Sequence, residues 1–107
     1  MGISCEISHK YMEQAEKEII NNFKHAMYDK IQLRHGRYSP MGWKSMDIKR
    51  LIWLLEGELA ELKEAYNSND TGNALKDGAY RNIRKGSIQD EAVDIANYAM
   101  FIYELSK

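Results

Sequence analysis

The chain has 107 residues, enough for one domain with a modest core, and its 15 basic and 16 acidic residues leave a formal net charge of -1. A nucleic-acid-binding surface normally carries an excess of basic residues, so this balance argues against DNA or RNA as a partner. The single cysteine, Cys5, excludes an internal disulfide and suits a reducing compartment. No stretch has the apolar character of a signal peptide or a membrane span, so we expect a cytoplasmic protein without a membrane partner.

Hydrophobic periodicity predicts two long helices in the first two thirds of the chain. Between residues 8 and 35, apolar residues recur every three or four positions, which is typical of an amphipathic helix. Residues 36–43, GRYSPMGW, contain the only proline and two glycines, which predicts a turn. A second helix is expected over residues 47–67, with Ser45 or Asp47 as its N-cap.

Two more helices are expected in the last third. Residues 73–85 could form a short basic helix that Gly86 ends, and residues 88–106 a final helix. Ser87 and Asp90, three residues apart, resemble a capping box at its start. No segment alternates as a strand would, so residues 1–107 are predicted to form a single all-α domain built as a four-helix bundle.

The second helix carries two carboxylates in an unexpected position. On a helical wheel of the stretch LLEGELAEL, residues 54–62, Glu58 falls within the apolar arc and Glu61 at its edge. Residues three apart are neighbours on a helix surface, so these two carboxylates can converge. One Glu-x-x-Glu pair alone is common on solvated helix faces.

The final helix repeats the pattern with Glu91 and Asp94, in a segment that is apolar nearly all round. Four ionised carboxylates on apolar faces would be very unfavourable without partners. Protonation or pairing with lysine or arginine could relieve this cost, but a divalent cation would satisfy all four at once. A ligand set made only of oxygen atoms favours Mg²⁺ or Mn²⁺ over zinc.

The residues around these acids resemble a known family. Glu58-Leu-Ala-Glu61 and Glu91-Ala-Val-Asp94 look like the ExxE and ExxD motifs of the MazG-like all-α nucleoside triphosphate pyrophosphohydrolases, which include helical dUTPases and dCTP pyrophosphatases. Gly42-Trp43 and the run IANYAM at residues 95–100 are also similar to members of this family. The resemblance covers about residues 42–103 and implies a four-helix MazG-like bundle completed by dimerisation.

The resemblance also implies an activity: Mg²⁺-dependent hydrolysis of an NTP or dNTP to the monophosphate and pyrophosphate, with Mn²⁺ as a possible substitute, in nucleotide-pool cleaning. Carried over by position, Glu58, Glu61, Glu91 and Asp94 become the metal ligands. Glu58 and Glu61 are also the catalytic candidates, with Glu61 expected nearest the attacking water. A homodimer or a dimer of dimers is implied. The base and sugar preference stays open, and the interval between Glu61 and Glu91 is long for the family.

Three aromatic or polar residues are implied as substrate contacts. Trp43 stands where family members place an aromatic side chain against the base, and it could equally anchor the core after the turn. Tyr98 could support the site, touch the sugar or pack in the core. Asn97 could recognise a base or phosphate edge, or cap a loop.

Cations form the second set of candidate substrate contacts. Lys49 matches a position where relatives carry a basic residue near the phosphates. Arg81 and Arg84 belong to the basic segment between the two acidic pairs, and all three cations could instead be solvated surface charges. A non-catalytic helical module for nucleotide binding or protein interaction is the alternative function. Trp53, on the outer face of the second helix, is expected to be exposed in a monomer and to mark a dimer contact.

Overall fold

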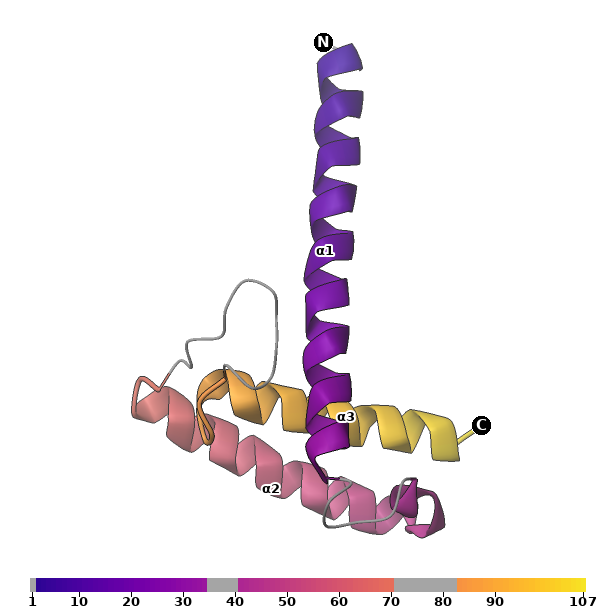
Figure 1. Cartoon of the computed structure of the whole chain (residues 1–107), viewed down its shortest axis with the longest axis vertical. Coiled ribbons are helices and arrows are strands. Elements are labelled where there is room, and N and C mark those ends of the chain that lie inside the picture. The colour runs from indigo at the N-terminus through magenta and orange to yellow at the C-terminus, as the bar shows by residue number, and fades with distance from the viewer. Residues whose placement is uncertain (1, 35–40, 71–82) are drawn as a thin grey trace.

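The computed structural model describes residues 2–34, 41–70 and 83–107, and this part of the chain is all-α, as predicted. It contains the helices α1 (Gly2–Arg34), α2 (Ile48–Asn67) and α3 (Ile88–Leu105), with a short 3₁₀ helix, η1 (Gly42–Ser45), ahead of α2 (Figure 1). Within these ranges no residue forms a strand. None of the described helices is both long enough and apolar enough to cross a membrane.

The expected four-helix bundle is not confirmed, because the helix predicted over residues 73–85 falls mostly on residues 71–82, outside the described ranges. Residues 83–85, the described end of this segment, form a bend and a turn, so the helix prediction is wrong there. The amide of Ser87 donates to the carbonyl oxygen of Arg84 at 3.1 Å. Gly86 follows with a φ of 81°, a left-handed conformation that glycine adopts readily.

Helices α2 and α3 lie side by side and run in opposite directions (Figure 1). Asp47 caps α2 by accepting a hydrogen bond from the amide of Lys49 at 3.2 Å, which confirms one of the two predicted caps. The end of α2 is tied to the start of α3, since the amide of Ile88 donates to the carbonyl oxygen of Asp70 at 2.6 Å. The first turn of α3 therefore lies beside the end of α2.

Helix α1 crosses the α2–α3 pair, and much of its length projects away from it (Figure 1). It is 33 residues long and begins at Gly2, earlier than the predicted start at Ser8. Its C-terminal part contacts α3, where Ala26 is buried. Further towards the N-terminus, Ile19 and Phe23 are exposed. The apolar face predicted for this helix is thus only partly covered within a single described chain.

The core is small and unusually polar. Among the described residues, the buried hydrophobic side chains are Ala26, Leu51, Ala65, Val93 and Phe101. The buried polar or charged side chains are Lys30, Ser87, Asp90, Glu91, Asp94 and Asn97. Most of this second group belongs to α3, the helix between the other two. The polar groups therefore need partners from the facing helices, and those partners define the candidate site.

Candidate functional site

Three glutamates from facing helices converge on one point. Glu58 and Glu61 project from α2 and Glu91 from α3, and each offers a carboxylate oxygen within 4.8 Å of the other two. On α2, Glu58 follows the fully buried Leu51 by two helical turns, so it lies on the stripe that packs against α3. We call these three residues the glutamate cluster.

The glutamate cluster contains carboxylate oxygens that lack a hydrogen-bond partner within residues 2–34, 41–70 and 83–107. Glu91 is 5% exposed, and its Oε2 atom has no hydrogen-bond partner among the described groups. The Oε2 atom of Glu58 is buried and unpartnered in the same way. Buried polar atoms in folded proteins are nearly always satisfied, so these two oxygens point to a missing positive group or donor.

Burial and mutual repulsion change the protonation of this cluster. Burial, strengthened by the neighbouring Glu58 and Glu61 carboxyls, raises the pKa of Glu91 to about 9. Burial also raises the pKa of Glu58 to about 7, although its interaction with Glu91 acts in the opposite direction. Without a cation, the cluster therefore holds a proton at neutral pH. A bound divalent cation would displace that proton, since metal ligands must be ionised.

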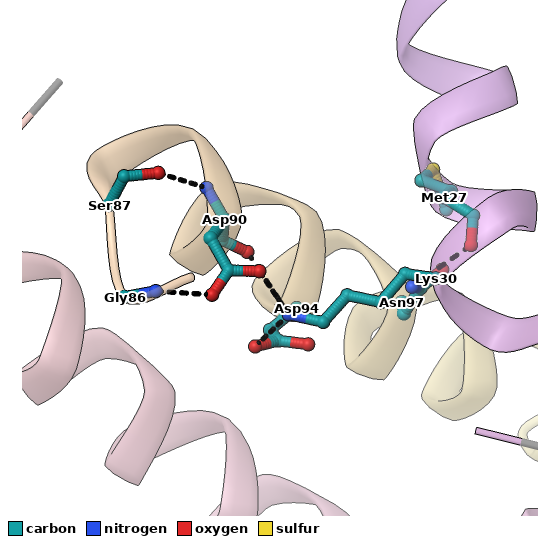
Figure 2. Close-up of polar contacts among 7 residues, drawn as sticks. All are labelled: Met27, Lys30, Gly86, Ser87, Asp90, Asp94 and Asn97. Atoms are coloured by element: carbon teal, nitrogen blue, oxygen red, sulfur yellow. Dashed lines mark hydrogen bonds and ion pairs between the residues drawn. The ribbon is translucent and has the colours of Figure 1, made fainter. Parts of the chain in front are cut away.

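Two aspartates of α3 are paired with a lysine that the sequence analysis did not identify. Lys30 Nζ lies 2.6 Å from Asp90 Oδ1 and 2.5 Å from Asp94 Oδ2. It also lies 3.4 Å from the carbonyl oxygen of Asp90. Figure 2 shows the Lys30 side chain reaching from α1 to both carboxylates. We call Asp90 and Asp94 the lysine-paired aspartates.

The ion pairs between Lys30 and the two aspartates are buried, and Lys30 itself is only 7% exposed. Burial alone would lower the pKa of Lys30, but the hydrogen bonds and charges of Asp90 and Asp94 outweigh it and raise that pKa. A signal for this residue was present in the sequence: Lys30 follows Ala26 by one turn, so a charge interrupts the inward stripe of α1, as Glu58 does on α2.

Asp90 also starts helix α3. The Ser87 hydroxyl accepts from the Asp90 amide at 3.2 Å, and Asp90 Oδ2 accepts from the Gly86 amide at 2.7 Å (Figure 2). This confirms the predicted pairing of Ser87 and Asp90 at the N-cap, although the carboxylate binds the amide before the cap residue. The Asp90 carboxylate thus binds the backbone at the start of α3 with one oxygen and Lys30 with the other.

An open cavity of about 900 Å³ joins both groups of acids. Its wall includes the glutamate cluster, the lysine-paired aspartates and Lys30, and it also includes Glu64 and Lys85. A smaller hollow of about 400 Å³ lies against Glu58 and Glu61 and is bounded by Trp53. Trp53 is 64% exposed, as predicted, and the guanidinium carbon of Arg50 lies 5.9 Å from the centroid of its ring.

The aromatic candidates pack beside this cavity's helices and do not line it. Trp43 stacks on Phe101, with 4.5 Å between the ring centroids and 12° between the ring planes. Tyr98 meets the same ring edge to face, at 6.0 Å and 86°. Neither belongs to the described wall of the cavity. In this structure, Trp43 fastens η1 to α3.

The polar and basic candidates have separate positions. Asn97 is buried, and its Nδ2 donates to the carbonyl oxygen of Met27 at 3.3 Å, which links α3 to α1 (Figure 2). Lys49 is exposed in the first turn of α2, about 14 Å along the helix axis from Glu58. Arg84 forms an ion pair with Asp70, and Arg81 lies outside the described residues. Lys85, a basic residue of the segment between α2 and α3, lines the cavity.

The residues fit a hard divalent cation. The glutamate cluster offers oxygen ligands from two helices, and its unpartnered buried oxygens are the atoms that such an ion would bind. Comparisons of the chain with protein-family models, with curated proteins and with solved structures found no match. We therefore infer the function from the geometry of the cavity and its charged groups, together with the two acidic motifs.

Proposed function

We propose that the chain is a Mg²⁺- or Mn²⁺-dependent nucleoside triphosphate pyrophosphohydrolase that converts an NTP or dNTP to the monophosphate and pyrophosphate. The observation that carries the proposal is the convergence of Glu58, Glu61 and Glu91 on one cavity, with buried oxygens that have no hydrogen-bond partner in the described part of the chain. The cavity volume of about 900 Å³ lies within the usual range for small-molecule sites. The two acidic motifs support the same activity.

Each carboxylate has a role in this proposal. Glu58, Glu61 and Glu91 would hold the cation. Asp94, the fourth ligand expected from the sequence, belongs to the adjacent group of acids on α3 and is paired with Lys30, so it would act beside the cation through that lysine. When bound, the cation supplies positive charge that offsets the triphosphate and polarises a phosphoryl oxygen. Glu61 is exposed at the cavity, so its carboxylate is accessible to both water and substrate.

Glu61 is therefore the proposed proton acceptor. It would take a proton from a water molecule as the water oxygen forms a bond to phosphorus. The anhydride bond between the α and β phosphates breaks, and pyrophosphate leaves with the electron pair of that bond. Lys85, exposed at the same cavity, is placed to bind a phosphate oxygen. Removal of surplus or damaged nucleotides is the role that such a reaction suits.

We also propose that the protein is a homodimer in which a second copy covers α1. The stripe that buries Ala26 against α3 continues through Phe23 and Ile19 to Met12, and these three side chains are exposed. The covered and uncovered parts belong to one continuous face of one helix, which a symmetric partner could complete. Light scattering should show a dimer at micromolar concentration, and Ile19→Glu should convert it to a monomer.

Pyrophosphate release from a panel of ribo- and deoxynucleoside triphosphates tests the activity. We expect release with Mg²⁺ and none with a chelator. Glu61→Ala and Asp94→Ala should abolish it in folded protein. Glu104→Gln, an exposed acid near the end of α3, is the matched control and should retain it. Release that persists in the Glu61 and Asp94 variants would remove these residues from the mechanism.

A non-catalytic nucleotide-binding module is the second candidate function, and one observation favours it. Asp94, a ligand in the proposed enzyme, is engaged by Lys30 at 2.5 Å. Nucleotide binding that requires Mg²⁺ but produces no pyrophosphate from any member of the panel would support this module over the enzyme.

A further inference from the structure

The acids of α3 form a second group of possible ligands beside the first. Asp90, Glu91 and Asp94 also offer oxygen atoms that lie within 4.8 Å of one another. Glu91 belongs to both groups, so the two positions are adjacent. Two divalent cations bridged by shared carboxylates are a common arrangement in enzymes that cleave phosphate bonds. The carboxylates alone would therefore suit two ions as well as one.

Lys30 distinguishes the two positions. Its ammonium group contacts Asp90 Oδ1 and Asp94 Oδ2 at 2.6 and 2.5 Å, so it lies between the carboxylates that a second cation would use. The glutamate cluster has buried oxygens at Glu58 and Glu91 that no described residue contacts with a hydrogen bond. The Lys30 ammonium group thus fills the position between Asp90 and Asp94. The glutamate cluster has carboxylate oxygens that could still bind a cation.

The surrounding helices fix the lysine in place. Ala26, one turn earlier on α1, is buried, and the carbonyl oxygen of Met27 accepts a hydrogen bond from Asn97 of α3. Asp90 is held from its other side by the Gly86 amide at 2.7 Å (Figure 2). Withdrawal of Lys30 would remove the charge of its ammonium group from two buried carboxylates, which is strongly unfavourable.

We propose that Lys30 takes the place of a second divalent cation, so that each chain binds one metal ion at the glutamate cluster and uses the Lys30 ammonium as the second positive charge. Lys30 lines the same cavity as Glu58 and Glu61, so its charge faces the space where the proposed function places the polyphosphate. The inference rests on that proposed function for the identity of the substrate. The number of ions bound can be measured without any substrate.

The test is the stoichiometry of Mn²⁺ binding, measured by titration calorimetry and by electron paramagnetic resonance. Wild-type protein should bind one Mn²⁺ per chain with an uncoupled six-line spectrum. Lys30→Met keeps the length of the side chain but removes its charge, and it should bind two ions with a coupled spectrum. Lys30→Arg should restore a single ion, and Lys24→Met, at an exposed position of α1, should behave as wild type.

The outcomes separate this inference from the proposed function. Two coupled ions in the wild type, or one ion in both wild type and Lys30→Met, would overturn it. If Lys30→Met does not fold, the wild-type spectrum at saturating Mn²⁺ decides: a coupled pair overturns the inference and an uncoupled ion supports it.

Three further results concern the two proposals together. One ion in the wild type without pyrophosphate release would refute the activity and leave the role of Lys30 intact. No ion in the wild type but one in Lys30→Met would refute the metal site at the glutamate cluster and overturn the inference with it, because the inference requires one ion in the wild type. No Mn²⁺ in either protein would overturn both.

Discussion

The glutamate cluster and the lysine-paired aspartates lie on the same cavity and draw on the same helix, yet their charges are balanced differently. Glu91 is buried and faces further acids from α2, and burial first, then these acids, raise its pKa to about 9. Asp90 and Asp94 face a lysine from α1, at 2.6 and 2.5 Å. The facing helix, more than the acid itself, therefore decides whether a buried carboxylate is stable as an ion or needs a proton or a metal.

The largest expected effect comes from removing the internal cation. Lys30→Met should lower the free energy of unfolding by about 3–5 kcal/mol, because it removes the ammonium group that pairs with two buried aspartates. Urea denaturation in the presence of chelator measures this loss. Lys24→Met, on the exposed face of α1, should stay within about 0.5 kcal/mol of wild type. Equal stability of the two variants would contradict the buried ion pairs.

Neutral replacements in the two groups should have effects of opposite sign. Asp94→Asn should destabilise the protein by about 1–3 kcal/mol, since Lys30 loses a charged partner. Glu91→Gln should leave the metal-free protein unchanged or slightly more stable near neutral pH, because Glu91 already carries a proton there. Urea titrations of both variants at pH 7 in chelator make the comparison. A large loss in Glu91→Gln would show that its ionised form is the stable one.

The metal-free protein should become less stable as the pH rises. The pKa values of Glu58 and Glu91, about 7 and about 9, lie above their ordinary value of 4.5, so the folded state binds protons that the unfolded state releases. This stabilisation is complete below about pH 4.5 and is lost as the pH rises through 7 and 9.

Thermal unfolding in chelator at several pH values, corrected for the background slope of Glu91→Gln, measures the effect. We expect the melting temperature of the wild type to fall more steeply than that of Glu91→Gln. Mg²⁺ should oppose the fall, because its affinity increases as the glutamates ionise. Parallel slopes for the two proteins would contradict the raised pKa of Glu91.

The smallest effect on stability is expected at the exposed member of the glutamate cluster. Glu61→Gln should change the free energy of unfolding by less than about 0.5 kcal/mol, since the side chain is solvent-accessible. Pyrophosphate release should nevertheless fall by about 10²–10⁴-fold, the usual contribution of a positioned acid or base. Parallel denaturation and activity measurements would separate these two effects, and unchanged activity would assign the proton transfer elsewhere.

Local signals predicted α2 and α3 well because their ends depend on nearby residues. Asp47 and Ser87 cap these helices through contacts two or three positions away. The burial of Glu91 and Asp94 and the partial burial of Glu58 followed from helical periodicity alone. Glu61 was predicted at the edge of the stripe, and it is exposed.

The partners of these residues could not be predicted, because they come from distant parts of the chain. Lys30 and Asp90 are 60 residues apart, and no local pattern pairs them. Trp43 had a base-stacking and a core role open to it, and only the fold placed Phe101 against its ring. The direction in which α1 crosses the other helices (Figure 1) likewise depends on tertiary packing. The spacing of apolar residues along α1 does not predict that direction.

The double use of Asp90 has a consequence for cooperativity. One of its carboxylate oxygens accepts a hydrogen bond from the Gly86 amide, just before α3, and the other accepts one from the Lys30 ammonium group of α1. Undocking of α1 would therefore also weaken the nucleation of α3, and Glu91 is the very next residue. Amides in the first turn of α3 should then exchange with solvent together with those around Lys30, as one unfolding unit. We therefore expect the docking of α1 and the formation of the acidic cavity to occur together, as one folding event.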